Sequence, residues 1–183
     1  MAYIWYMSVN FGDDRAAADR FVEEYDGSEF QVPGETAFTI HLDHGVEDDH
    51  RNGWEVCVMP LVGLPGVKPA PGSFLNGTAG PADDLEASDL DAAAVVIYER
   101  LKKCIGYSWA MFNCEPGGWR SPKKLVEDLS PGGFLRERGL AGLEGLVISE
   151  ALWNEAQQPE HFVRFCDGFM WCPWVGSMRG VWR

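Results

Sequence analysis

The spacing of hydrophobic residues predicts a strand and then a helix at the start of the chain. Residues 3–11 are rich in aromatic and β-branched side chains, which is typical of a strand. Asp13 or Asp14 can cap the helix that follows. The apolar residues of this helix recur at helical spacing among charged ones: Ala16, Ala17, Phe21, Val22 and Tyr25.

Two strands joined by a polar segment are expected next. Residues 36–42 alternate in the way that favours a strand, and residues 43–52 are polar enough for a hairpin loop. Residues 53–60 predict the returning strand. We expect Pro60 to close this strand, because proline cannot donate a hydrogen bond to a strand ladder.

A long segment rich in proline and glycine follows, at residues 60–87. Connections longer than about 12–15 residues are uncommon in compact domains and are often functional. The residues before this segment offer few helices to cover their sheet, so the strands on both sides should share one core. We therefore expect residues 1–183 to form a single domain in which 60–87 is a contact loop.

The second half predicts two helices and further strands. Ser88 should cap a helix that continues to about residue 105, and residues 106–114 fit a strand. A Ser-Pro pair at 121–122 favours the start of a short helix, which the Pro-Gly-Gly sequence at 131–133 ends.

The end of the chain leaves one choice open. Residues 143–148 fit a strand, and a helix over 143–153 fits nearly as well. Residues 161–166 and 169–174 predict a terminal hairpin around an Asp-Gly turn. The elements alternate without the rhythm of parallel βαβ units, so we expect an α+β domain, a mostly antiparallel sheet with two or three helices packed on one face.

Acidic residues are concentrated in the first half of the chain. Residues 1–99 hold 19 Asp and Glu against 4 Lys and Arg, whereas residues 100–183 hold 9 against 11. The net charge of −13 therefore divides as −15 and +2. Such a field attracts a basic partner and opposes a phosphate backbone, so we do not expect direct binding to nucleic acid.

No established catalytic signature is present. The chain lacks a GxSxG elbow, a P-loop, a dinucleotide fingerprint and an HExxH motif. Its five cysteines fit neither a metal knuckle nor a disulfide framework, so we expect buried, reduced thiols. The N-terminus has no basic head, and no stretch is long and apolar enough for a membrane helix. These features favour a cytoplasmic protein without a cofactor and without membrane contact.

One polar cluster could bind a metal ion. Imidazole and carboxylate groups, which zinc accepts as ligands, gather in residues 41–50: His41, Asp43, His44, Glu47, Asp48, Asp49 and His50. A solvated hairpin loop explains the same residues. We therefore predict no metal site and keep a metal-dependent hydrolase as an alternative function.

Segments near the C-terminus resemble a known family. Residues 143–150 (LEGLVISE), 162–165 (FVRF) and 169–176 (FMWCPWVG) are similar in style to the small acidic immunity proteins that bacteria encode beside polymorphic or contact-dependent toxins. The resemblance implies a cytoplasmic, non-enzymatic protein that neutralises one cognate toxin by covering its active site. It transfers no individual site residue.

The charge distribution favours the same class independently. Nucleases are basic because they hold phosphate backbones, and carboxylates can take the place of those phosphates while aromatic side chains supply buried anchors. A phage anti-defence protein that imitates DNA would share these features, and the oligomeric state stays open. The residues expected to bind the partner are Asp43, Glu47, Asp48, Asp49, Trp119 and Trp174.

Overall fold

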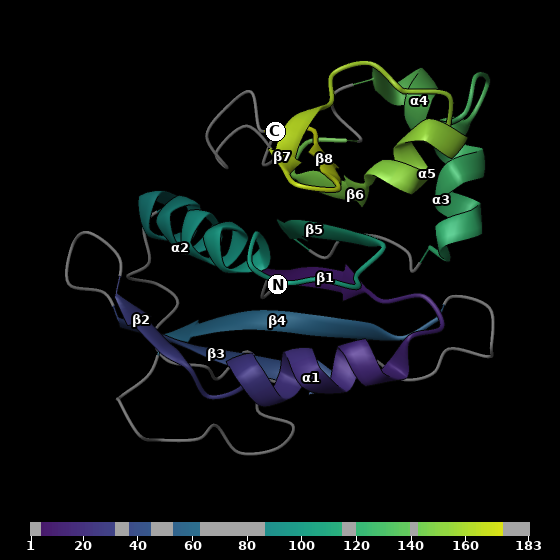
Figure 1. The fold of residues 1–183 in the computed structure, drawn as a ribbon. Helices are drawn as coiled ribbons and strands as arrows, with labels where there is room; N and C mark the ends of the chain where they lie inside the picture. Colours follow the sequence, from purple (N-terminus) through teal and green to yellow (C-terminus); the bar gives the residue numbers. More distant parts are fainter. Residues whose placement is uncertain are drawn as a thin grey trace.

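The computed structural model describes residues 5–31, 37–44, 53–62, 87–114, 120–139 and 143–173. In these ranges the chain forms one eight-stranded sheet and five helices (Figure 1). The strands are β1 (Trp5–Asn10), β2 (Glu29–Gln31), β3 (Ala37–His44), β4 (Glu55–Val62), β5 (Trp109–Cys114), β6 (Leu146–Ser149), β7 (Val163–Cys166) and β8 (Phe169–Trp171). The helices are α1 (Arg15–Tyr25), α2 (Ala87–Leu101), α3 (Pro122–Leu129), α4 (Phe134–Arg138) and α5 (Glu150–Glu155).

β1 lies near the centre of the sheet. The strand order is β2-β3-β4-β1-β5-β6-β8-β7, and every neighbouring pair is antiparallel. β1 pairs with β4 from Met7–Val58 to Asn10–Glu55, and with β5 from Trp5–Cys114 to Asn10–Trp109. The predicted α+β class with a mostly antiparallel sheet is therefore confirmed.

One face of the sheet packs against α1 and α2. Alternate residues of the central strands are buried in this core: Met7, Val9, Val56, Val58, Ala110 and Phe112. The two helices contribute small and aromatic side chains to it: Ala17, Ala18, Phe21, Tyr25, Ala94, Ile97, Tyr98 and Leu101. The Asp14 side chain caps α1 by accepting a hydrogen bond from the Ala17 N–H at 2.9 Å, as the sequence predicts.

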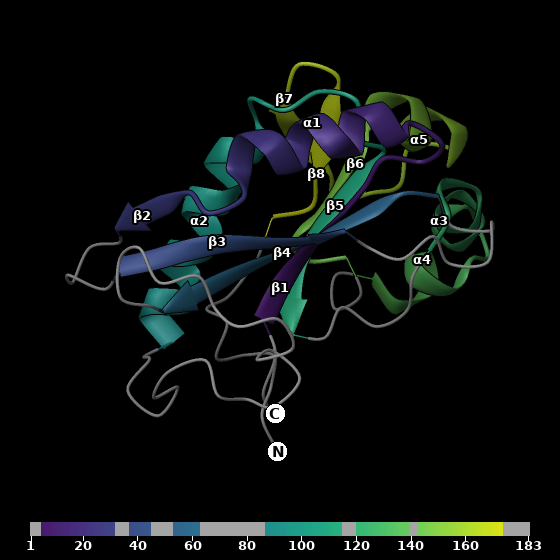
Figure 2. The same cartoon turned by 90° about the horizontal axis from the view of Figure 1, so that it is seen from below.

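The opposite face is covered at its β5–β6 end by three short helices. Trp109, Leu146 and Ile148 belong to a second core with residues of α3, α4 and α5. Figure 1 and Figure 2 show these helices grouped at one end of the sheet. The two helices predicted on one face are α1 and α2, and three further short helices cover part of the other face. β5 and β6 are apolar at consecutive positions, so both of their faces need cover.

Two predicted boundaries around Pro60 and the loop after it need correction. β4 continues through Pro60 to Val62, so residues 60–62 are not loop. Ile40, the partner of Pro60 in register, directs its N–H and carbonyl to Ser28 and Gly27 and not to β4. The nitrogen of Pro60 therefore points away from β3, and the pairing with β1 has already ended at Val58, so the missing N–H costs little.

The α2 boundaries also differ from the prediction. The helix begins at Ala87, so Ser88 lies inside it, and it ends at Leu101 before a turn. The N–H groups of Lys103 and Cys104 bond to carbonyls three residues back, which tightens the last turn. Residues 63–86, the remainder of the predicted loop, lie outside the described residues.

Residues 143–153, for which the sequence left strand or helix open, contain a strand followed directly by a helix. Residues 146–149 form β6, and the Ser149 hydroxyl then caps α5, which starts at Glu150. The predicted terminal hairpin is confirmed as β7 and β8, with Gly168 at a φ of 80° in its turn. A bulge interrupts this pair between Arg164 and Cys166. Helix α4 had no counterpart in the prediction.

The Tyr98 side chain makes hydrogen bonds to the backbone at the place where the pairing of β5 with β6 ends. β6 pairs with β5 only from Trp109–Ile148 to Met111–Leu146. Beyond that pairing, the Phe112 N–H donates to the Tyr98 hydroxyl at 3.1 Å, and the hydroxyl donates to the Gly145 carbonyl. A side chain of α2 therefore binds two buried backbone groups at the place where the pairing of β5 with β6 ends.

Replacing Tyr98 with phenylalanine should destabilise the protein by about 1–3 kcal/mol, because it leaves a buried N–H and a buried carbonyl without their partner. Tyr107 is a matched control, since its hydroxyl is buried and has no hydrogen-bond partner among the described residues. Urea unfolding of Y98F and Y107F measures both effects. Equal losses in the two variants would contradict the bridging role.

Candidate functional site

Only one of the six residues predicted to bind a partner lies in the described part of the chain. Asp43 is in β3, where it pairs with Cys57, so the strand extends two residues into the predicted hairpin loop. Glu47, Asp48, Asp49, Trp119 and Trp174 lie outside the described residues. Their role in binding stays a prediction.

The alternative metal site is likewise described only in part. His41, Asp43 and His44 belong to β3, whereas the other members of the cluster fall in residues 45–52, outside the described ranges. Within the described ranges, no group of three or more His, Cys, Asp or Glu side chains could hold a metal ion. The cluster at residues 41–50 is therefore not tested as a whole, and the hydrolase alternative stays a prediction.

Seven of the acidic residues that the structure describes lie on α1 and the turns beside it. Residues 13–29 contain seven acids and two arginines. We call this set the acidic surface: Asp13, Asp14, Asp19, Glu23, Glu24, Asp26 and Glu29. All are exposed except Asp19, which is partly exposed and pairs with Arg15 at 3.5 Å.

α1 is fixed to the rest of the fold along its length. Its apolar side packs on the sheet, and the Cys104 thiol bonds to the Tyr25 hydroxyl at 3.4 Å. Arg100 of α2 donates to the Ser28 hydroxyl at 2.5 Å and to the Glu29 carbonyl at 3.1 Å, just beyond the helix. The helix that carries most of the acidic surface is therefore anchored both along its packed side and just beyond its C-terminal end.

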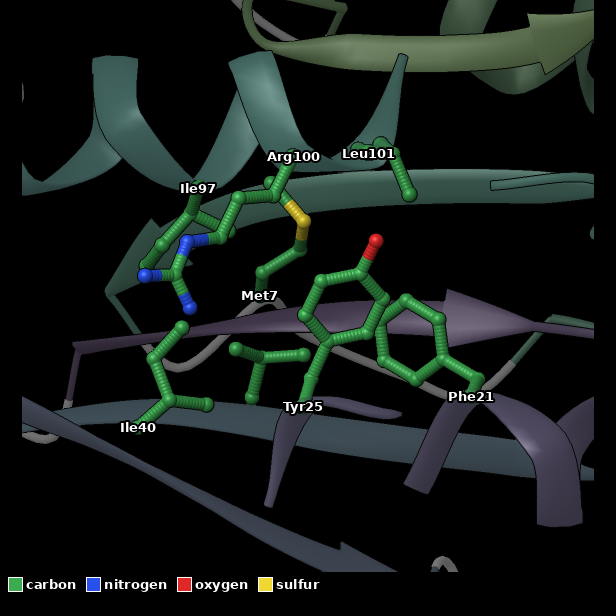
Figure 3. A pocket seen from close by; sticks show the side chains of 8 residues that line it. Met7, Phe21, Tyr25, Ile40, Ile97, Arg100 and Leu101 are labelled. Carbon is green, nitrogen blue, oxygen red and sulfur yellow. The ribbon is translucent and has the colours of Figure 1, made fainter. Parts of the chain in front are cut away.

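A small cavity separates α1 from α2 (Figure 3). It is lined by apolar side chains and Arg100: Met7, Phe21, Tyr25, Ile40, Val58, Ile97, Arg100 and Leu101. The cavity has room for little more than one water molecule. Figure 3 shows the Arg100 guanidinium reaching across it from α2. It is a packing gap beneath the acidic surface, too small for a substrate.

The segment that contains α3 and α4 has a different charge balance. Residues 120–139 hold five basic and three acidic residues. Asp128 is buried between Arg120, at 2.9 Å, and Lys124, at 3.0 Å. Burial alone would raise the pKa of Asp128, but the hydrogen bonds from Lys124 and Arg120 outweigh it and lower that pKa. Residues 120–139 therefore carry a net charge of +2, in contrast to the net charge of −5 of residues 13–29.

A second buried carboxyl lies on a face of the sheet, and sequence patterns did not predict its burial. Glu55 of β4 is 3% exposed, beside Ser8 and Asn10 of β1, on the face opposite α1. Burial raises its pKa to about 7, although hydrogen bonds from Ser8 and Asn10 act in the other direction. A buried carboxyl with a pKa near neutrality can change its charge under ordinary conditions.

Neither the acidic surface nor the burial of Glu55 was predicted from the sequence, and the two have different physical reasons. The acidic surface corresponds to the charged side of the predicted first helix, but the acidic run at residues 43–49 is denser in sequence and was predicted as the binding site instead. Glu55 occupies a polar position of an alternating strand, which ordinarily faces water. Only the three-dimensional cover over that face makes it a buried group.

We expect the described cysteines to react slowly with thiol reagents. Cys104 and Cys172 are buried, and burial raises the pKa of each to about 11, so the reactive thiolate is scarce at neutral pH. Labelling of these two residues should be about a hundredfold slower in native protein than in urea. Rapid modification of either one in the native state would contradict this.

Comparison with known proteins adds no relative. No model of a protein family, no curated protein and no solved structure matches the chain. None of the described helices is long and apolar enough to span a membrane. The function must therefore be argued from the surfaces and side chains of this protein.

Proposed function

We propose that this protein is a non-enzymatic, cytoplasmic inhibitor that binds a basic protein partner, in the manner of a bacterial immunity protein. The observation that supports this proposal best is the acidic surface on α1. Seven acids against two arginines give residues 13–29 a net charge of −5. A surface of this kind attracts a basic partner and speeds its encounter.

The rigid attachment of α1 suits a docking surface. Its caps, its packed side and the Arg100 contacts hold the helix backbone that carries the carboxylates before a partner arrives. Less conformational freedom is then lost on binding, which favours affinity. In a nuclease partner, these carboxylates would occupy the positions that substrate phosphates take.

An exposed apolar residue lies beside the acidic surface. Ile105 is 80% exposed, and both of its chain neighbours approach α1. Cys104 bonds to Tyr25, and a Cβ at Gly106 would lie 3.1 Å from the Cβ of Ala17. Ile105 can therefore supply the apolar contact that carboxylates alone lack.

The function is tested by co-expression with the product of the neighbouring gene, because immunity proteins of the kind this chain resembles are encoded beside their toxins. We expect that product to stop growth alone and to form a stable complex with this protein when the two are made together. A harmless neighbour that does not bind would contradict the proposal.

Reversing charge on α1 should slow association with that partner. The double variant D19K/E23K should reduce the association rate several-fold at low salt and weaken its dependence on ionic strength. A matched control, E127K/E137K, makes the same charge change at exposed positions of α3 and α4 and should have a smaller effect. Stopped-flow measurements over a range of salt concentrations compare the two.

A third set of variants tests the acidic residues that the sequence predicts as the binding site. Charge reversal at Asp43, Glu47, Asp48 and Asp49 should also slow association if residues 43–49 contribute to steering. An association rate that is the same at low and high salt in the unmodified protein would exclude electrostatic steering by either set.

A further inference from the structure

The Glu55 carboxyl lies in a buried polar cluster next to the junction between β1 and α1. Ser8 is 3% exposed and Asn10 is 0% exposed, and both come from the strand paired with β4. The Oε2 atom of Glu55 has no hydrogen-bond partner among the described residues. A buried carboxylate needs more hydrogen bonds than this site offers, so the neutral acid fits it better.

The junction itself is tightly closed. The Phe11 N–H donates to the Trp54 carbonyl at 2.7 Å, and the Trp54 N–H donates to the Gly12 carbonyl at 2.7 Å. The Asn10 side chain accepts from the Gly12 N–H at 2.9 Å. Gly53 approaches so closely that a Cβ there would lie 2.5 Å from the Gly12 oxygen. The residues that hold Glu55 therefore also hold the chain that leads into α1.

Among the described residues, no charged side chain shifts the pKa of Glu55, and Arg120, the cation just before α3, is paired with Asp128. On its face the described neighbours are Ser8 and Asn10 of β1, Cys57 on its own strand and Trp109 of β5 in register with Asn10. Asp43 of β3 is in register with Cys57 and is acidic. On the opposite face Arg15 lies over the Trp54 ring, 4.7 Å from its centroid. Burial, and no ion pair, governs the titration of Glu55.

We propose that Glu55 is a pH-sensitive lock on the β1–α1 junction. When the carboxyl is protonated, the Ser8–Asn10 cluster accommodates it and the junction stays closed. When it ionises, the closed junction holds an uncompensated charge that the open junction would expose to water. Rising pH therefore increases the fraction of molecules in which residues 11–14 and 53–55 separate, and this holds whether or not the protein has the function proposed above.

The sign and size of the effect follow from proton linkage. An exposed glutamate ionises near pH 4.3, whereas burial keeps Glu55 protonated up to about pH 7. Between these limits the open form has lost a proton that the closed form keeps. The opening constant should then rise about tenfold per pH unit from pH 5 to pH 6.5, and level off above pH 7.5.

Hydrogen exchange at the Phe11 and Trp54 amides measures this opening directly. After correction for intrinsic exchange, the protection of these two amides should fall about tenfold per pH unit between about pH 5 and pH 6.5. The E55Q variant keeps the shape of the side chain and removes its charge, so its protection should not fall in this way. E127Q, a change at an exposed glutamate of α3, should keep the unmodified slope. The Ser130 amide, bonded to Val126 in α3, should not respond.

Three results would contradict the proposal that Glu55 controls opening of the β1–α1 junction. The first is a slope in E55Q equal to that of the unmodified protein. The second is an equal loss of protection at Ser130, which would make the effect global. The third needs no variant: in the unmodified protein, the carboxyl carbon of Glu55 should titrate with a midpoint about 7 by NMR, and a midpoint near 4.3 would contradict the proposal.

Discussion

The antiparallel pairing of β1 with both β4 and β5 is the constraint on which the rest of the fold depends. This one strand joins the β2–β4 part of the sheet to the β5–β8 part, although its partners come from residues 55–58 and 109–114. Its alternate residues point to the two opposite faces of the sheet. Met7 and Val9 enter the core under α1 and α2, whereas Ser8 and Asn10 form the polar cluster with Glu55. A shift of one residue in register would exchange the two sets, so the register is strongly fixed.

Much of this architecture was predictable because local signals agree with the tertiary fold. The Asp14 cap, the Ser121-Pro122 start of α3 and the Gly168 turn are decided by residues within a few positions of one another. The failures have a different origin. Pro60 stays in β4 because no neighbour needs its N–H, and that depends on where β1 begins to pair. No local pattern contains this information.

The candidate site was less predictable than the fold for the same reason. Composition located the negative charge in the first half but could not say which acids share a surface. The helical period of α1 places Asp19 and Glu23 opposite the buried Phe21 and Tyr25, and the structure adds the contacts of Arg100 and Cys104 that hold the helix. The burial of Glu55 depends on cover that is distant in sequence.

The β7 edge bears on how this protein behaves at high concentration. β7 is an outer strand of the sheet, and an outer strand offers unpaired backbone groups to any other extended chain. Here the strand is four residues long, a bulge bends it between Arg164 and Cys166, and Arg164 is exposed on it. The opposite outer strand, β2, has only three residues. Within the described residues, both outer strands are therefore short, which disfavours pairing of another extended chain along them.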